Sequence, residues 1–333
     1  MNQTINGSFT SFTRCSNPPN PTAQKVGKIF AYCLILLVSL VGNSLIAVTV
    51  YKTKRLRKPI NFFIVNMAMS DLLLPIFVFP KSLTELYTNS WQIGGPLGQA
   101  LCKLVSSFLP NVSTAVSSQS LVLIAVDRFG AVVFPHRSSL ISSKMCPFFI
   151  LATWIVAMAF FSPYLVAQKL VEFDSGLMFC VGQWPTKYGR SSLAKYLLAL
   201  YVLFLYVPIA LLVVFYSTIL IKLKTQIFPG EQSTNAGQQR ARRNKKVLKM
   251  AIAIVLGFVL CWVPYSIVNL LQVFARNRRF ACGISLYLPT IAEFMYLSNC
   301  AINPCICFIF SGIYRQSVKR ILKCFCSVEE SEQ

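Results

Sequence analysis

The sequence LVLIAVDRFG, residues 121–130, places an aspartate and an arginine directly after an unbroken apolar run. This run ends a longer apolar stretch, 104–126, which as one helix can cross a hydrocarbon layer about 30 Å thick. Asp127 and Arg128 therefore stand at the end of the span, where charged side chains reach the aqueous interface at little cost. The stretch predicts a membrane-spanning helix that ends in a charged pair.

The composition of the whole chain is that of a membrane protein. Of the 333 residues, 55% are hydrophobic and 13% are charged, whereas about 25% are charged in ordinary soluble domains. Lipid must therefore be the main solvent of this chain. Seven apolar stretches are long enough to span a bilayer as helices, at residues 29–50, 62–79, 104–126, 147–167, 196–221, 247–274 and 284–310. The predicted fold is an all-α membrane protein, with a seven-helix bundle over residues 29–310.

The basic residues predict which end of the bundle faces the cytoplasm. Five of them lie between Lys52 and Lys58, in the short loop after the first span, and short cytoplasmic loops are rich in lysine and arginine. The N-terminus is therefore expected outside, as a glycosylated segment over residues 1–28 with sequons at Asn2 and Asn6. These features predict a multi-pass protein of the plasma membrane.

The net charge of +22 does not predict nucleic-acid binding, because basic loops that flank apolar helices serve membrane topology and contact with anionic lipids. We expect membrane lipids as partners and no nucleic acid. A transporter would show duplicated halves with broken helices, and an enzyme would need clustered catalytic or metal-ligating side chains. The chain shows no such duplication and has one histidine, so neither class is expected.

Two of the twelve cysteines are placed to form an extracellular disulfide. Cys102 opens the third span at its outer end, and Cys180 lies in the outer loop between the fourth and fifth spans. Because the outside of the cell is oxidising, we expect the two to be bridged. Cys15 and Cys282 are the other cysteines on outer segments, so a second bridge between them is an open alternative.

Asp71 is the most deeply placed charge within a span, and neutral polar side chains occupy similar depths in other spans. They include Ser117, Asn299 and Asn303. A carboxylate with several neutral oxygens nearby suits a small hard cation such as Na⁺, and the same groups also suit a hydrogen-bond cluster that holds the bundle together. Both interpretations stand, and apart from Na⁺ no cofactor is expected.

Two acidic side chains near the outer end of the bundle are candidates for ligand binding. Glu85 lies at the outer end of the second span and Glu293 in the outer half of the seventh. Charged groups placed there favour a cationic ligand that docks from outside, with Glu293 as its counter-ion. The alternative is pairing with nearby basic residues, such as Lys81, Lys169 or Arg276.

Prolines in the sixth and seventh spans indicate hinges. Trp262 precedes Pro264 in the sequence CWVP, and Asn303 directly precedes Pro304 in NPCIC. A proline inside a helix frees a backbone carbonyl and favours bending, which suits a bundle that moves between two arrangements.

Taken in order along the chain, these motifs resemble those of the rhodopsin-like G-protein-coupled receptors. The similar positions are GNSLI at 42–46, Asp71, VDRF at 126–129, Trp154, Pro208, Tyr216, Phe258, CWVP at 261–264 and NP at 303–304. In addition, WQIG at 91–94 resembles the first outer loop of peptide-binding members. The resemblance covers residues 28–326 and implies a receptor, not an enzyme.

The resemblance implies a signalling switch at the cytoplasmic ends of the helices. In the resting receptor Asp127 would hold Arg128. On activation the sixth span would swing outward, and Arg128 would turn toward Tyr216 and the Gα subunit of a heterotrimeric G protein. The residues implied in this switch are Asp127, Arg128, Phe129, Tyr216, Phe258, Trp262, Pro264, Asn303 and Pro304. Phe129 replaces the tyrosine of many relatives, and Cys307 replaces the tyrosine that ends the family's NP motif, which implies an altered activation latch.

The resemblance also narrows the class of ligand. Amine receptors carry an aspartate at the depth of Pro110, and opsins carry the retinal lysine at the position of Leu297, so both classes are disfavoured. The chain is most similar to receptors of the neuropeptide FF, RFamide and neuropeptide Y branch, which implies an amidated neuropeptide as ligand. A lipid or another small molecule is the alternative. The candidate ligand-binding residues are Glu85, Glu293, Trp262, Asn111 and Gln272.

The chain after the seventh span reads as a short amphipathic eighth helix over residues 311–326, lying along the inner leaflet. Cys324 and Cys326 are candidate palmitoylation sites, or alternatively two free thiols. Residues 327–333 form a short cytoplasmic tail. Arrestin is a further partner that the family resemblance implies for this face, but the tail has only Ser327 and Ser331 as phosphate acceptors, so strong capture of arrestin through the tail is not expected.

Overall fold

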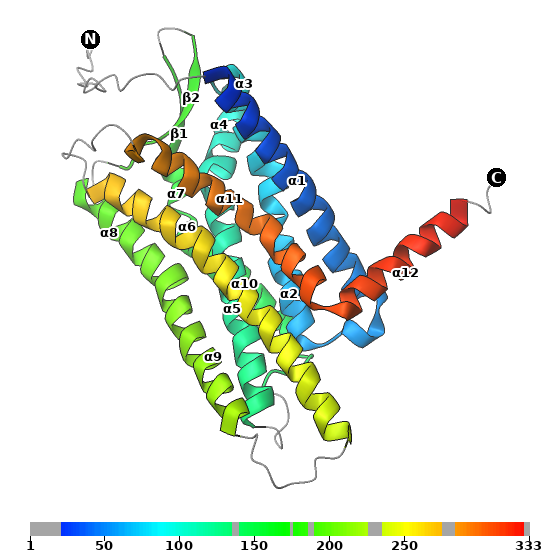
Figure 1. Cartoon of the computed structure of the whole chain (residues 1–333). Coiled ribbons are helices and arrows are strands. Elements are labelled where there is room, and N and C mark those ends of the chain that lie inside the picture. The colour runs from blue at the N-terminus through cyan, green and yellow to red at the C-terminus, as the bar shows by residue number, and fades with distance from the viewer. Residues whose placement is uncertain are drawn as a thin grey trace.

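The computed structural model describes residues 21–134, 140–173, 176–185, 190–225, 235–274 and 284–329. In this part of the chain, seven helical segments are long and apolar enough to cross a membrane, at Thr22–Lys52, Pro59–Thr88, Gly95–Val133, Cys146–Ala167, Ser192–Leu223, Lys246–Phe274 and Tyr287–Phe310. Each overlaps one of the seven spans expected from the sequence, and most of them extend past the expected bounds. The all-α bundle is thereby confirmed (Figure 1).

Several spans consist of more than one helical element. The first three spans and the turn after the first contain α1 (Pro21–Lys52), η1 (Lys54–Leu56), α2 (Pro59–Asp71), η2 (Leu74–Val78), α3 (Phe79–Thr88), α4 (Gly95–Lys103), η3 (Leu104–Phe108) and α5 (Leu109–Val133). The other four contain α6 (Cys146–Phe161), α7 (Tyr164–Ala167), α8 (Arg190–Tyr201), η5 (Val202–Tyr206), α9 (Val207–Thr225), α10 (Asn235–Phe274) and α11 (Ile284–Phe310).

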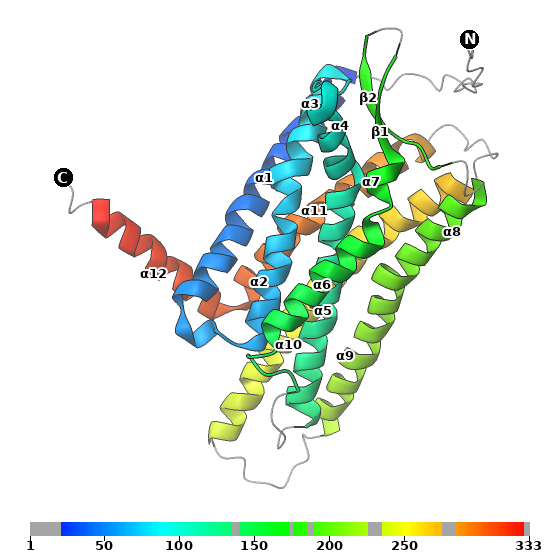
Figure 2. The ribbon, with the colours of Figure 1, turned by 180° about the vertical axis from the view of Figure 1, so that it is seen from behind.

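A hairpin and an eighth helix mark the two ends of the bundle. Strands β1 (Gln168–Glu172) and β2 (Met178–Gly182) pair antiparallel, and Figure 2 shows them rising above one end, called here the hairpin end. Helix α12 (Gly312–Glu329) leaves α11 at the other end, called the α12 end (Figure 1). The eighth helix is therefore present, and it extends past the expected boundary at residue 326.

The charged pair of the third span lies inside its helix and not at the helix end. Helix α5 continues to Val133 because the residues after Arg128, FGAVV, include no proline and fit the same helix. The sequence-based boundary at residue 126 followed the apolar run, whereas the helix continues for seven residues past it. Asp127 and Arg128 are therefore held by helical backbone on both sides.

Three spans contain a five-residue π turn, and each of these turns ends two residues before a proline. The turns η2, η3 and η5 end at Val78, Phe108 and Tyr206, and the prolines are Pro80, Pro110 and Pro208. A proline ring clashes with the carbonyl four residues earlier, and in each case that carbonyl belongs to the π turn. The wider turn relieves this clash, so the helix continues through the proline without breaking.

Buried polar side chains link the spans within the bundle. Trp154 Nε1 donates a hydrogen bond to Asn66 Oδ1 at 2.8 Å, and Asn66 Nδ2 donates to Ser120 Oγ at 2.9 Å. Asn43 Nδ2 donates to the Cys300 carbonyl at 2.9 Å. Because a polar group without a partner is costly in a low-dielectric interior, these bonds favour one arrangement of α1, α2, α5, α6 and α11.

Helices α1 and α11 approach closely where Gly42 faces Pro304. A Cβ atom on Gly42 would lie 2.6 Å from Pro304 Cβ and 2.8 Å from Pro304 Cγ, closer than real Cβ contacts. The glycine therefore lets the backbone of α1 rest against the proline of the NP motif.

The Gly42→Ala variant is expected to be less heat-stable than the Gly27→Ala variant. Overpacking at a tight contact costs about 1–3 kcal/mol, whereas replacing a helical glycine by alanine gains up to about 1 kcal/mol at either position. Gly27 is a matched control because it lies in the same helix with no atom within 4 Å of the added Cβ. The measurement is the Tm of the two purified variants, and equal Tm values would show that α1 moves off Pro304 without cost.

Candidate ligand cavity and signalling core

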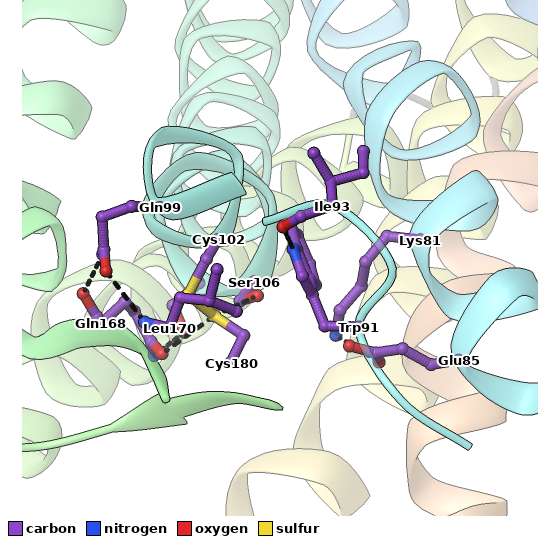
Figure 3. Close-up of a disulfide and its surroundings, with 11 residues drawn as sticks. Lys81, Glu85, Trp91, Ile93, Gln99, Cys102, Ser106, Gln168, Leu170 and Cys180 are labelled. Atoms are coloured by element: carbon purple, nitrogen blue, oxygen red, sulfur yellow. Dashed lines mark hydrogen bonds and ion pairs between the residues drawn. A yellow bond between two sulfur atoms is a disulfide. The ribbon is translucent and has the colours of Figure 1, made fainter. Parts of the chain in front are cut away.

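The hairpin is fixed to the third span by a disulfide and by hydrogen bonds (Figure 3). Cys180 of β2 is bonded to Cys102 of α4, which confirms the expected bridge. On the neighbouring strand, Leu170 N donates to Gln99 Oε1 at 3.0 Å, and Gln99 Nε2 donates to the Gln168 carbonyl at 3.3 Å. The two cysteines are 78 positions apart in the sequence. Closing a loop of this length adds about 4–5 kcal/mol to the free energy of unfolding in the chain-entropy model. The hairpin is thus a fixed part of the hairpin end.

A cavity of about 340 Å³ lies under the hairpin, between the ends of α3, α5, α8, α10 and α11. Four of the five residues that the sequence suggested for ligand binding line it, namely Asn111, Trp262, Gln272 and Glu293. Glu85 is not among the described residues that line it. Gln168 and Gly182 of the hairpin form part of its wall.

The π turns determine which residues of the second and third spans face the cavity. A π turn holds about one residue more than a turn of α-helix, so the side chains that follow are rotated by about 100°. After η2, Lys81 and Ser82 line the cavity, and Ser106 and Ser107 of η3 line it together with Asn111.

The floor of the cavity is a set of packed aromatic rings. The ring of Tyr296 lies 4.5 Å from that of Trp262, edge to face, and 4.6 Å from that of Tyr265, stacked. Such pairs contribute about 0.5–1.5 kcal/mol each beyond their buried area. The buried Nε1 of Trp262 has no hydrogen-bond partner among the described residues. The floor therefore offers aromatic faces to a ligand, with a buried N–H group that has no partner beneath them.

Lys81 and Glu293 are the two charged side chains among the described residues that line the cavity. Lys81 Nζ lies 2.8 Å from Glu85 Oε2, one turn further along α3 (Figure 3). The sequence left two interpretations open for Glu85, namely binding a ligand cation and pairing with a nearby basic residue. In the structure Glu85 forms the second kind of contact. Glu293 is exposed to the cavity and has no ion-pair partner within 4.0 Å in the described part of the chain. It is the acidic group available to a ligand.

Three of the polar residues suggested for Na⁺ meet in the middle of the bundle. Asp71 is 1% exposed, and its two oxygens accept hydrogen bonds of 2.7 Å from Ser117 Oγ and from Asn303 Nδ2. Asn299 lies one turn before Asn303 on α11. The side-chain oxygens of both asparagines are buried and have no partner among the described residues. Oxygens without donors fit a small cation, while the two hydrogen bonds also join α2, α5 and α11.

The charged pair of α5 lies near the α12 end. Asp127 is 4% exposed, and its Oδ2 accepts hydrogen bonds from Nε of Arg128, at 3.0 Å, and from Nη2. The guanidinium of Arg128 lies near the buried phenol of Tyr216 on α9. The ring of Phe129 packs 5.3 Å from that of Phe215. This arrangement brings together the first four residues of the switch.

The other switch residues form a column from the cavity floor into the core. The rings of Trp262 and Phe258 lie 6.2 Å apart along α10, and Pro264 follows inside the same helix. Asn303 and Pro304 lie inside α11. Helices α10 and α11 pack along each other, so these two sets of residues lie on neighbouring helices.

Cys307 stands where the family's NP motif ends in tyrosine, and a tyrosine of the eighth helix lies in the same region. Cys307 is fully buried, and Tyr314 of α12 is 1% exposed. The Tyr314 hydroxyl donates to Asn61 Oδ1 of α2 at 3.2 Å, and its ring packs against Phe308. Burial holds the pKa of the Tyr314 phenol well above its ordinary value, so the group is a neutral donor. A hydroxyl in this region therefore comes from α12.

Tyr265 and Tyr296 were not suggested from the sequence as ligand contacts, although their spacing could have indicated them. Tyr265 follows Trp262 by three residues, and Tyr296 follows Glu293 by three. Residues three apart share a face of a helix. Once Trp262 and Glu293 are assigned to the cavity, the two tyrosines belong there as well.

Several sequence-based expectations fall outside what the structure describes. Asn2, Asn6, Cys15 and Cys282 lie outside the described residues. Cys324 and Cys326 lie in the final part of α12, where only the course of the helix is described. Glycosylation, a second disulfide and palmitoylation therefore stay predictions.

Comparison with known proteins gives matches along the bundle. The model of the family described as 7 transmembrane receptor (rhodopsin family) matches residues 42–307. The RYamide receptor of Drosophila melanogaster is 31% identical over 89% of this chain and 63% of its own length, which is less than two thirds. Neuropeptide FF receptor 1 of Rattus norvegicus is 30% identical over 92% of this chain and 72% of its own length. The QRFP-like peptide receptor of Branchiostoma floridae is 28% identical, with 92% and 79% covered.

Proposed function

This chain belongs to the rhodopsin family of seven-transmembrane receptors, and from this membership we propose that it binds an extracellular peptide and activates heterotrimeric G proteins. It is a receptor and not an enzyme. In the proposal the hairpin end faces the outside of the plasma membrane and the α12 end faces the cytoplasm. The basic residues from Lys52 to Lys58 then lie on the cytoplasmic side, as such residues do in membrane proteins.

The proposed class of ligand, a peptide with a cationic group, rests mainly on Glu293. This residue is an exposed carboxylate in a cavity whose floor consists of aromatic rings. A ligand that matches these surfaces has a cation beside an aromatic ring. A peptide that ends in Arg-Phe-amide has both, because the guanidinium can pair with Glu293 and the ring can pack on Tyr265 and Trp262. A neutral C-terminal amide suits this site better than a carboxylate, which Glu293 would repel.

The similar receptors support a peptide ligand. Their names refer to RYamide, to neuropeptide FF and to QRFP-like peptides. Pro110 lines the cavity at the depth where the amine receptors carry an aspartate, so the cavity offers no carboxylate there.

Signal transmission in this proposal follows the aromatic column. A ligand ring on Trp262 changes its packing against Phe258, and α10 swings outward about the bend at Pro264. The movement releases Arg128 from Asp127, and Arg128 then contacts Tyr216 and the Gα subunit. Cys307 has no hydroxyl to add to this arrangement, so the active state depends more heavily on Arg128 and Tyr216.

The same proposal assigns a Na⁺ ion to the cluster around Asp71. Two buried amide oxygens without donors, on Asn299 and Asn303, support this assignment. Asp71 would supply the charge, and Ser117 would supply a further oxygen. An ion held between α2, α5 and α11 would stabilise the arrangement of these helices.

Sodium is expected to raise the Tm of the purified receptor compared with choline at equal ionic strength. A ligand that binds only the folded state stabilises it by about 1.4 kcal/mol at ten times its Kd. The Asp71→Asn variant should lose this difference, because the substitution removes the charge of the site. A sodium effect of the same size in both proteins would leave the hydrogen-bond cluster as the sole role of Asp71.

At the cytoplasmic side, α12 would lie on the inner leaflet. Its exposed basic residues Arg315, Lys319 and Arg320 would face lipid phosphates. Palmitate on Cys324 and Cys326 would strengthen the attachment. The cytoplasmic end of the bundle would receive the G protein and, after it, arrestin.

The proposed function is tested in cells that express the receptor with a G-protein dissociation sensor. C-terminally amidated peptides, the same peptides as free acids, and a panel of lipids are applied separately. A response to Arg-Phe-amide peptides that is lost in the free acids would support the proposal. A response to lipids alone, with the receptor present at the surface, would overturn the peptide assignment and keep the receptor assignment.

A further inference from the structure

We propose that Glu85 sets the charge preference of the cavity by holding Lys81 away from Glu293. In this role Glu85 is a positioning residue that does not touch the ligand. The inference rests on the proposed function, in which Glu293 is the counter-ion of a ligand cation.

The geometry of α3 places Glu85 beside Lys81 and outside the cavity wall. Val78, Lys81, Ser82 and Glu85 follow the spacing of one helix face. The first three line the cavity, whereas Glu85 lies one turn further from its floor. Lys81 Nζ is 2.8 Å from Glu85 Oε2, and the two side chains are 23% and 33% exposed. Figure 3 shows this pair, and the ammonium is therefore drawn toward Glu85, away from the cavity floor.

Stabilisation of α3 is a weak explanation for this pair. In a helix, a lysine four residues before a glutamate is the less favourable of the two orders. Pairs of this type that face solvent contribute about 0.3–0.5 kcal/mol. The pair has a clearer role at the cavity. Lys81 lines the cavity, and Glu85 is its one ion-pair partner among the described residues, so without Glu85 the ammonium would have no partner.

Lys81 also lies in the electrostatic field of Glu293. The carboxylate of Glu293 is attracted by Lys81 and Lys28 and repelled by Glu85. If Glu85 is replaced by the neutral glutamine, Lys81 loses its ion-pair partner. Glu293 is then the one acidic side chain among the described residues of the cavity wall. A lysine side chain is long and flexible, and attraction between charges is strong where water is partly excluded. Lys81 would therefore turn to Glu293 and occupy the place of the ligand cation.

The consequence is a preference for ligands that carry a cation. With Glu85 present, Lys81 is held in an ion pair and Glu293 is open, so a guanidinium gains an ion pair. With Glu85 neutral, a guanidinium must displace Lys81 and is repelled by it. A ligand with a neutral group of the same shape is little affected by either arrangement.

The test uses two peptides that differ in one group, one ending in Arg-Phe-amide and the other in citrulline-Phe-amide. The ratio of their potencies is measured with the G-protein sensor in wild type, Glu85→Gln, the double variant Lys81→Gln/Glu85→Gln, and Glu293→Gln. Surface expression is measured for each. The Glu85→Gln change is expected to reduce the preference for arginine about tenfold, which corresponds to about 1.4 kcal/mol. The double variant is expected to restore the preference, because the competing cation has been removed.

Each outcome decides between the inference and the proposed function. If Glu293→Gln removes the preference and Glu85→Gln leaves it intact, the role of Glu85 is refuted and the proposed function stands. If Glu85→Gln lowers the preference and the added Lys81→Gln does not restore it, Glu85 acts on the fold of α3 and the inference is wrong. If wild type does not prefer the arginine peptide, or if Glu293→Gln retains the preference, Glu293 is not the counter-ion of the ligand. The role proposed for Glu85 is then wrong as well.

Discussion

The Arg128→Ala variant is expected to bind its peptide normally and to lose G-protein activation. In the structure Arg128 is held by Asp127 and lies near Tyr216, 17 residues after the cavity residue Asn111 on α5 and thus about 25 Å along the helix. Sites without shared partners act independently, so peptide affinity should stay within about twofold of wild type. Loss of a charged contact that is buried against a partner costs about 2–5 kcal/mol, and activation should therefore fall more than about 30-fold.

The measurement combines peptide binding with the G-protein dissociation sensor in the same cells. The Asp127→Asn variant provides the complementary change, because it weakens the hold on Arg128 without removing the guanidinium. Its signal without ligand is expected to rise above that of wild type. Full activation by Arg128→Ala at normal surface expression would show that the charged pair of α5 is not the switch.

The Glu293→Gln variant is expected to lower the potency of an Arg-Phe-amide peptide about 30-fold or more. The carboxylate has no ion-pair partner within 4.0 Å among the described residues, so a ligand guanidinium is its expected partner. Removing one member of a hydrogen-bonded charge pair costs at least about 2 kcal/mol, which gives this factor. The citrulline analogue, which carries no charge, should change little.

Glu172→Gln is the matched control for this change. Glu172 is an exposed acid on β1 at the same end of the bundle, and it is not among the described residues that line the cavity. Potency in this variant should stay within about twofold of wild type, because an exposed charge at a distance is screened by salt. If both variants lose potency equally, the general negative field of the hairpin end would attract the ligand, and no single carboxylate would bind it.

The fold could be predicted because it depends on local patterns. Apolar runs of sufficient length require helices in lipid, and the oxidising compartment makes Cys102 and Cys180 a reasonable pair. The helix boundaries were less accurate, because α5 continues to Val133 after its apolar run has ended. The π turns before Pro80, Pro110 and Pro208 were not predicted, since proline alone also allows a kink.

The candidate site could be predicted only in part, because its contacts join distant parts of the chain. The sequence gives the four-residue spacing of Lys81 and Glu85 but also offers Lys169 and Arg276 as partners, and the structure shows the 2.8 Å contact with Lys81. The lack of an ion pair at Glu293 depends on the distance between basic side chains of other helices and α11, which no local pattern in the sequence sets. The hydrogen bond between Tyr314 and Asn61 spans 253 positions, and neither residue has a local pattern that indicates it.

The three π turns have a consequence for how this receptor can change in evolution. Each amounts to a one-residue insertion in an α-helix, placed beside the cavity. Deletion of one residue within η2 would turn α3 by about 100° and move Lys81 and Glu85 to another face, while α2 and Asp71 stayed in place. The cavity can thus be remodelled by single-residue insertions and deletions that spare the inner half of the bundle. Because each π turn relieves the clash with a proline two residues later, such a deletion is tolerated when that proline is lost as well.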